Sequence, residues 1–250
     1  MREVHRNVSA YEKVSQRALS ALNERGFMED RIKEIARAAG ADLCGIAEVE
    51  RFSAAPEGFR PTDIYADCRS VVVLAKAMPK GLAYVSPRII YNHAGDVNLA
   101  ELDRIVLNMA MEIERLGGIA VPLPSDGPYD YWETETLTGK GLLSMRHAAV
   151  QAGLGSLGKN TLLINKEYGN LLNIGAVLTD LTLRSDELSE TLCVPGCRRC
   201  LDACPVHALD GTSANQQLCR PNAYGTTERG FGVVNCNRCR MACPRKFGTR

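Results

Sequence analysis

The residues most suited to chemistry are cysteines: eight of the ten lie between residues 193 and 243, in two runs that both finish in Cys-Pro. The first run reads CVPGCRRCLDACP and begins at Cys193; the second reads CNRCRMACP and begins at Cys236. Such spacing is typical of proteins with two [4Fe–4S] clusters, in which the last cysteine of a run ligates the other cluster. The sequence therefore predicts two four-iron clusters.

The two runs predict a crosswise set of ligands. Three close cysteines hold three irons of a cube, so the fourth corner needs a cysteine from elsewhere in the chain. The first cluster is expected on Cys193, Cys197, Cys200 and Cys243, and the second on Cys204, Cys219, Cys236 and Cys239. Cys219 fills the gap left by a second run of only three cysteines. One departure from the usual pattern is the three-residue gap between Cys193 and Cys197.

Zinc and disulfides are the alternatives for these cysteines. A zinc ribbon would pair the two C-x2-C steps, but those steps are far apart for a ribbon and four cysteines would stay unexplained. Disulfides are typical of oxidising compartments. The N-terminus lacks the apolar core of a signal peptide, and no apolar run is as long as a membrane span. We therefore expect a cytoplasmic protein that does not enter a membrane. Cys44 and Cys68 are expected to be small buried hydrophobic residues.

A glycine-dense stretch, AGLGSLGKN at residues 152–160, resembles two nucleotide loops at once. Its glycines fit G-x-G-x-x-G, and with Lys159 they nearly fit a P-loop, although Asn160 stands where Ser or Thr would hold magnesium. Both loops follow a strand and open a helix. Here a helix is expected before the glycines and a strand after them, so neither nucleotide loop is favoured. The plain alternative is a helix C-cap at Gly153.

The rest of the pattern indicates a mixed α and β domain at residues 1–185 and a cysteine-rich domain at 186–250. Strands are expected at 42–49, 70–77, 119–123, 161–165 and 171–181. A helix with an apolar stripe is expected to begin at a capping box formed by Asn98 and Glu101 and to end at Gly117 and Gly118. Ser144 is expected to cap a short helix that leads into the glycine loop.

Together, the segments RHAAVQAGLGSLGKNTLLIN and GAVLTDLTL and the two cysteine runs resemble the epoxyqueuosine reductase family, which is similar to the reductive dehalogenases. The match covers about residues 144–245. The resemblance implies an α+β protein: a nitroreductase-related mixed α/β domain followed by a ferredoxin-like domain with two [4Fe–4S] clusters. It implies an oxidoreductase in which the clusters pass electrons to a corrinoid (cobalamin) in the α/β domain, because amino-acid side chains carry no low-potential electrons.

The resemblance also implies cofactor contacts. The glycine loop would lie against the corrin edge, where Gly153, Gly155 and Gly158 allow a close approach and Lys159 or Asn160 bonds an amide. His147 could bond a cofactor amide or be a satisfied core histidine. For the proton donor, Asp126 is the nearest candidate by position, although the SDGP sequence around it is more typical of a turn. Tyr129, Tyr131 and Trp132 could line a pocket or fill the core.

The partners and the exact reaction stay open at this stage. The family's C-terminal extension is missing and the net charge is only +1, so tRNA is not expected as a partner. We expect instead a small-molecule or unknown substrate, with reduced ferredoxin, flavodoxin or another low-potential electron donor. The alternatives are a ferredoxin-type electron carrier without a corrinoid and a flavin-linked reductase.

Overall fold

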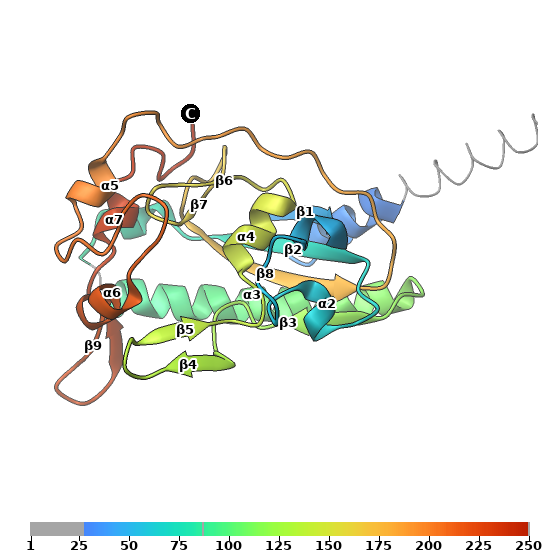
Figure 1. The fold of residues 1–250 in the computed structure, drawn as a ribbon, viewed down its shortest axis with the longest axis horizontal. Coiled ribbons are helices and arrows are strands. Elements are labelled where there is room, and N and C mark those ends of the chain that lie inside the picture. Colours follow the sequence, from blue (N-terminus) through green and yellow to red (C-terminus); the bar gives the residue numbers. More distant parts are fainter. Residues whose placement is uncertain (1–27, 87, 250) are drawn as a thin grey trace, which may run out of the picture.

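A four-stranded antiparallel sheet forms the centre of the molecule. The computed structural model describes residues 28–86 and 88–249. The strands are β1 (Leu43–Glu48), β2 (Ser70–Ala77), β3 (Ala120–Leu123) and β8 (Leu172–Thr179). Their order across the sheet is β1-β2-β8-β3, and every neighbouring pair is antiparallel. The sheet lies between helices in a mixed α and β architecture (Figure 1).

Both faces of this sheet are buried, because successive side chains of a strand point to opposite sides. On one face, Val72 and Leu74 of β2 pack with a helical segment at 28–38 and with α3 (Ile89–Arg115). On the other face, Val71 and Val73 pack with α4 (Met145–Gln151). The unbroken apolar run at residues 71–75 of β2 is what a strand covered on both faces requires.

The long helix α3 begins earlier than the sequence predicts. It starts at Ile89, so Asn98 lies inside it rather than at its N-cap. The capping-box prediction is wrong because Asn98 serves a tertiary contact: its buried amide donates to the Ala77 carbonyl oxygen and accepts from Asn173. The predicted end is confirmed, since Gly117 follows the helix with a φ of +93°.

The glycine loop follows a helix and leads into a strand, as the sequence predicts. Helix α4 is followed by the short strands β6 (Ser156–Leu157) and β7 (Leu163–Ile164), which pair with each other. The strand predicted at 161–165 is shorter than expected. This order confirms that the loop is placed differently from a dinucleotide or P-loop, in which a helix follows a strand.

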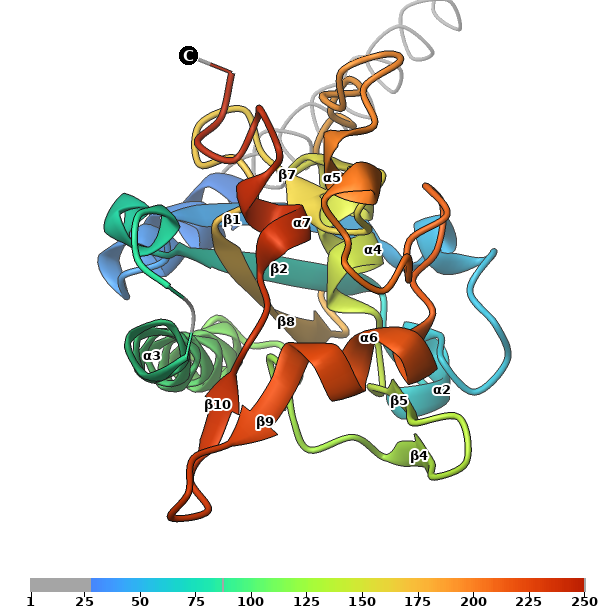
Figure 2. The ribbon, with the colours of Figure 1, turned by 90° about the vertical axis from the view of Figure 1, so that its left-hand side faces the viewer.

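The cysteine-rich segment covers one end of the sheet (Figures 1 and 2). Its elements are short: α5 (Arg199–Asp202), α6 (Gln216–Ala223), β9 (Tyr224–Thr226), β10 (Gly232–Val234) and α7 (Arg238–Met241). Strand β10 contacts α3, and α6 contacts β5 (Thr138–Lys140), which pairs with β4 (Tyr131–Glu133). The remaining elements are α2 (Pro61–Ile64) and two 3₁₀ turns, η1 (Val49–Phe52) and η2 (Lys80–Ala83).

The connection from β8 to the cysteines runs back along the length of the molecule (Figure 1). Its start is tied to β1: the Asp186 carboxylate accepts from the Ile46 backbone at 2.9 Å, and the Ser185 hydroxyl accepts from the Glu48 backbone at 2.8 Å. Residues on both sides of the predicted boundary at 185 therefore contact the sheet, and the boundary itself stays a prediction. Within the described residues, no helix is both long and apolar enough to cross a bilayer.

Candidate functional site

Four cysteines from both runs line one pocket. They are the members of the first predicted ligand set, Cys193, Cys197, Cys200 and Cys243. Three of them come from the first run, whereas Cys243 follows α7 in the second. Thiols are soft donors that suit iron–sulfur clusters. A pocket lined by four thiols fits a four-iron cluster, and the ligation itself stays a prediction.

The other four cysteines form a second group of neighbours, identified by the effects of nearby thiols on the pKa values of Cys219 and Cys239. Burial raises the pKa of Cys219, and the nearby thiols of Cys204 and Cys236 raise it further. Burial raises the pKa of Cys239 to about 11; Arg240 opposes this shift, and Cys219 and Cys236 add to it. Thiols with raised pKa values stay protonated unless a strong positive charge such as a metal centre stabilises the thiolate. This donor set also fits an iron–sulfur cluster.

The other two cysteines lie in the sheet region. Burial raises the pKa of Cys44 to about 12 and that of Cys68 to about 11. Cys44 is on β1, and the Cys68 thiol donates to the Ser70 carbonyl oxygen at 3.5 Å. Over residues 28–86 and 88–249, no three His, Cys, Asp or Glu side chains are grouped so as to hold a single metal ion.

Two glycines of the loop, Gly153 and Gly155, are packed against the protein's own backbone. The family resemblance instead explains the loop's glycines by the close approach of a corrin ring. A Cβ on Gly155 would lie 2.2 Å from the Ile164 carbonyl oxygen, and one on Gly153 would lie 2.2 Å from that of Glu187. Gly153 also has a φ of +74°, as expected for the end of α4. A Cβ on Gly158 would meet the Asn160 side chain at 2.8 Å. Internal packing thus accounts for these glycines, and contact with a corrin ring stays a prediction.

Lys159 and Asn160 are directed at the cysteine runs. The Lys159 ammonium donates to the Cys197 carbonyl oxygen at 2.9 Å, and the Asn160 amide donates to the Cys239 carbonyl oxygen at 3.0 Å. Both residues also line the four-cysteine pocket. The polar groups predicted to bond a corrin amide are therefore occupied by backbone carbonyls of the two runs.

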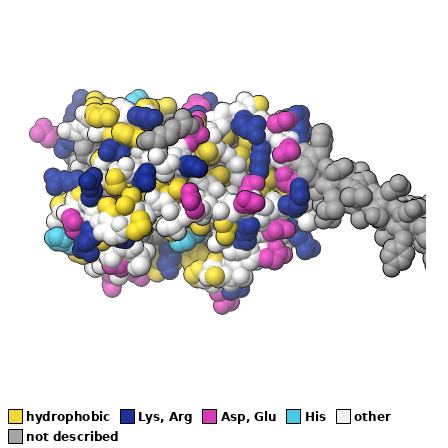
Figure 3. Space-filling model, turned by 90° about the horizontal axis from the view of Figure 1, so that it is seen from above, with side chains coloured by type: hydrophobic (Ala, Val, Ile, Leu, Met, Phe, Trp, Pro, Cys, Tyr) yellow, Lys and Arg dark blue, Asp and Glu magenta, His cyan; other side chains and the backbone are white. Residues whose placement is uncertain are grey.

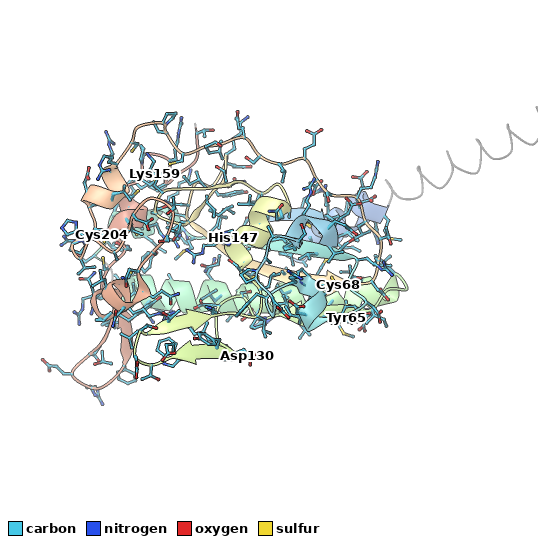
Figure 4. All side chains as sticks on the ribbon, in the orientation of Figure 1. Tyr65, Cys68, Asp130, His147, Lys159 and Cys204 are labelled. Carbon is cyan, nitrogen blue, oxygen red and sulfur yellow. The ribbon has the colours of Figure 1, made fainter. Side chains whose placement is uncertain are left out.

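His147 lies on α4, toward the middle of the molecule, whereas Lys159 and Cys204 lie near its cysteine-rich end (Figure 4). The His147 Nδ1 is 2.7 Å from the Ser144 hydroxyl. Burial and the neighbouring Arg146 lower the pKa of His147, so its imidazole is neutral at pH 7. The side chain is exposed, so the alternative of a buried core histidine is wrong.

Asp126 lies near side chains of both the sheet region and the cysteine-rich segment. Asp126, Arg146 and Tyr224 are all exposed to solvent, yet burial by surrounding atoms raises the pKa of Asp126 and Tyr224 and lowers that of Arg146. Exposed side chains with many surrounding atoms are typical of a concave surface. Arg220 lies close enough to lower the pKa of Asp126. We call this surface, formed by Asp126, Tyr129, Arg146, Arg220 and Tyr224, the concave face.

Arg220 joins the two sides of the concave face. Its guanidinium lies 5.1 Å from the Tyr129 ring centroid and 4.9 Å from that of Trp132. The two rings stack with centroids 6.3 Å apart. Next to it, Gln216 of α6 exchanges hydrogen bonds with the Gly139 backbone of β5. Tyr129, Tyr131 and Trp132 are all exposed, so they do not fill the core. Tyr129 and Trp132 contact Arg220 at the surface.

Sequence reasoning missed Arg146, Arg220 and Tyr224. Arg146 donates to the backbone oxygen and hydroxyl of Thr161, close to the glycine loop. Arg220 directly follows Cys219, and this neighbour is the feature of the sequence that could have indicated a place near a cluster ligand. Tyr224 had no signal in the sequence, because its contacts come from distant segments.

Comparison with known proteins finds no family model that matches the chain. An epoxyqueuosine reductase of Bacillus cereus is 27% identical over 209 residues, which is 75% of this chain and 51% of that protein. One from Lactococcus garvieae is 36% identical over 112 residues, 40% of this chain and 31% of that protein. The chain thus spans about a third to a half of these curated relatives.

Solved structures with the same fold include the epoxyqueuosine reductase of Streptococcus thermophilus, with a TM-score of 0.63 and 21% identity over 88% of this chain and 66% of that one. A reductive dehalogenase described in terms of B12-dependent dehalogenation has a TM-score of 0.60 and 22% identity over 85% of this chain and 31% of that one. A third structure, an epoxyqueuosine reductase with a tRNA stem loop, has a TM-score of 0.62 and 19% identity over 90% of this chain and 68% of that one.

This third structure contradicts the expectation that tRNA is not a partner. The expectation relied on the net charge of the whole chain, which hides a local imbalance. From residue 191 onward the sequence holds nine Lys or Arg residues but only three acidic ones, Asp202, Asp210 and Glu228. Lys and Arg side chains are prominent at the cysteine-rich end of the face seen in Figure 3. The distribution of charge, rather than its sum, decides contact with phosphates.

The similarity over three quarters of the sequence and the shared fold lead to one conclusion: the chain is a relative of epoxyqueuosine reductase.

Proposed function

We propose that this chain is an oxidoreductase with two crossed [4Fe–4S] clusters and a corrinoid, and that its substrate is epoxyqueuosine carried by tRNA. The observation that carries the proposal is the grouping of the eight clustered cysteines into two sets of four, each drawing on both runs. The first cluster is held by Cys193, Cys197, Cys200 and Cys243, and the second by Cys204, Cys219, Cys236 and Cys239. When bound, the clusters supply one-electron transfer at low potential.

The concave face is the proposed corrinoid site. The second group of cysteines lies near this face, because Arg220 directly follows Cys219 and the Cys219 thiol adds to the raised pKa of Tyr224. The edge of a corrin carries amides that both donate and accept hydrogen bonds. Arg146 and Arg220 are donors, His147 is a neutral imidazole, and Tyr224 offers a phenol. When bound, a corrinoid supplies a cobalt centre that accepts electrons and acts on the substrate.

Asp126 is the proposed proton donor at this face. A general acid must keep its proton near the working pH, and burial raises the pKa of Asp126 above the usual value of 3.8. Asp103 and Asp96 add to this rise, whereas Arg220 opposes it. One structural relative is an epoxyqueuosine reductase with an aspartate catalytic loop swung out of its active site. Asp126 likewise lies on a loop, the one between β3 and β4.

Transfer RNA is the proposed carrier of the substrate. Curated relatives are named epoxyqueuosine reductase, and one solved relative holds a tRNA stem loop. The basic cysteine-rich segment borders the concave face, where Arg220 and Tyr224 are exposed. Arginine and aromatic side chains together suit an unstacked base and its phosphates.

The experiment is a stepwise reconstitution under nitrogen. The protein is purified anaerobically, assayed for iron and sulfide, and titrated with cobalamin while the cobalt optical bands are followed. We expect about eight irons per chain, saturable cobalamin binding, and weaker binding in Arg146→Gln than in the exposed control Arg104→Gln. Filter binding should show salt-dependent retention of a tRNA anticodon stem loop.

Each outcome bears on a different part of the proposal. Stoichiometric zinc without sulfide would overturn the clusters. Full clusters without cobalamin binding, in either the Co(II) or the Co(III) state, would overturn the corrinoid. Cobalamin binding without turnover of epoxyqueuosine-containing tRNA would overturn the substrate and leave the two cofactors in place.

A further inference from the structure

The end of the glycine loop contacts both cysteine runs at once. Lys159 bonds the Cys197 carbonyl of the first run, and the adjacent Asn160 bonds the Cys239 carbonyl of the second. Asn160 is only 3% exposed and also accepts from the Leu162 backbone at 3.3 Å. Nearby, Asn170, only 1% exposed, donates to the Arg240 carbonyl oxygen at 3.2 Å. These contacts fix the positions of the two runs relative to the same part of the sheet region.

Lys159 brings a positive charge to the four-cysteine pocket. Its side chain reaches across to the cysteine-rich segment, where its Cγ would lie 3.9 Å from a Cβ on Gly211. It lines the pocket together with Cys193, Cys197, Cys200 and Cys243. Within residues 28–86 and 88–249, no carboxylate forms an ion pair with Lys159. Its charge is therefore not neutralised locally.

A fixed positive charge beside a cluster favours the reduced state, which carries one more negative charge. The potentials of iron–sulfur clusters depend on nearby charge and on hydrogen bonds. The partly buried position of Lys159 weakens solvent screening, so the interaction is stronger than it would be at the surface. Arg245, two residues after Cys243, also lines this pocket and brings a second positive charge to it. The other loop residues there, Gly158 and Asn160, carry no charge. Lys159 is thus the loop residue able to act through charge.

We propose that Lys159 is a positioning residue that raises the reduction potential of the cluster held by Cys193, Cys197, Cys200 and Cys243, while its bond to Cys197 fixes the first run. This inference rests on the proposed clusters and assigns the lysine to a cluster rather than to the corrin edge. The glycine-lysine-asparagine sequence then has one role: it connects both cluster-binding runs to the sheet region and sets the potential of one of them.

The test is a redox titration followed by electron paramagnetic resonance on the anaerobically purified full chain. Lys159→Gln should lower the midpoint of one cluster by about 59 mV, which is roughly a tenfold change for a one-electron couple. The midpoint of the other cluster should stay within error. Lys159→Arg keeps the charge and should restore the parent midpoint. The matched control is Lys76→Gln, because Lys76 also donates to a backbone carbonyl, that of Gly40, but lies on β2 in the sheet region.

Three results would overturn the inference. The first is an unchanged midpoint in Lys159→Gln with both clusters present. The second is an equal shift in Lys76→Gln. The third is an equal shift in Lys159→Arg, since that variant keeps the charge. Absence of clusters from the parent protein would instead overturn the proposed function, so the two failures are distinguishable.

Discussion

The sheet region and the cysteine-rich segment are stabilised in different ways. In the sheet region, two large apolar clusters cover both faces of the strands, and most of their members are fully buried. Among its described residues, the cysteine-rich segment buries few apolar side chains: Leu192, Cys200, Leu201, Cys204, Ala208, Val233 and Cys243. Three of these seven are proposed cluster ligands. Because metal binding contributes directly to folding in such small modules, we infer that this segment depends on its clusters and the sheet does not.

The largest effect should come from exchanging one ligand in each run. Cys243→Ser removes the distant corner of the first group, and Cys204→Ser removes that of the second. Each variant should lose about half of its iron, with the electron paramagnetic resonance signal of one cluster missing and the other retained. The two losses should be reciprocal, because each group of four draws on both runs.

The control for this exchange lies in the sheet region. Cys44→Ser and Cys68→Ser should leave the iron content unchanged, and both parent thiols should react slowly with iodoacetamide, because their raised pKa values keep them protonated. If Cys243→Ser disturbs only the cluster held mainly by the second run, the crosswise ligation is wrong. Loss of sheet structure along with the iron would contradict the inference that the sheet folds independently of the clusters.

Local sequence patterns predict much of the sheet region. The sequence predicts β2 at its observed bounds, residues 70–77, because the strand is centred on an unbroken apolar run, as burial on both faces requires. The start of α3 was missed, because Asn98 is typical of a cap in sequence but bonds to β2 and β8 in the structure. Local patterns cannot distinguish a polar residue at a helix end from one in a tertiary contact.

The site shows the same limit. The cysteine groups were predicted from spacing alone, because cluster ligation imposes a strict local order. In contrast, Arg220 lowers the pKa of Asp126 and lies over two aromatic rings, and all three partners are far from it in sequence. The sequence predicts that the glycine loop follows a helix and leads into a strand. Only the fold shows why the glycines are needed, because it brings them against the Ile164 and Glu187 backbones.

Gly155 tests how tightly the loop is packed in the sheet region. In Gly155→Val, a Cβ would meet the Ile164 carbonyl oxygen at 2.2 Å, so the backbone of β7 must shift. We expect a loss of about 3 kcal/mol in the free energy of unfolding, in the upper part of the range for single substitutions. Thermal and urea unfolding followed by circular dichroism measure it.

The matched control for Gly155 is Gly95 in α3. No atom lies within 4 Å of a Cβ at this position, and the helix interior favours alanine over glycine. Gly95→Ala should therefore stabilise the protein by up to about 1 kcal/mol. A Gly155→Val variant as stable as the parent would mean that the loop can move away from β7, and that open space beside a ligand is the better reason for its glycines.

The smallest expected effect concerns Asp126, where the two regions meet. Its carboxyl group belongs to the sheet region, and the charge that lowers its pKa is Arg220, from the cysteine-rich segment. Arg220→Gln should therefore raise the pKa of Asp126 further, because burial, Asp103 and Asp96 would act unopposed. Carbon-detected NMR titration of the Asp126 carboxyl measures this shift, with Arg104→Gln, an exposed arginine of α3, as the control.

The sign of the accompanying change in stability is fixed by linkage. An acid with a raised folded pKa binds its proton more tightly in the folded state than in the unfolded state. Its contribution is therefore fully present below the usual pKa of 3.8 and declines as the pH rises from there through the raised folded value. Asp126→Asn should flatten stability against pH across that window, and Arg220→Gln should extend the window upward. If the carboxyl titrates at the same pH in Arg220→Gln as in the parent, then Arg220 does not tune Asp126, and the concave face does not couple the sheet region to the cysteine-rich segment through charge.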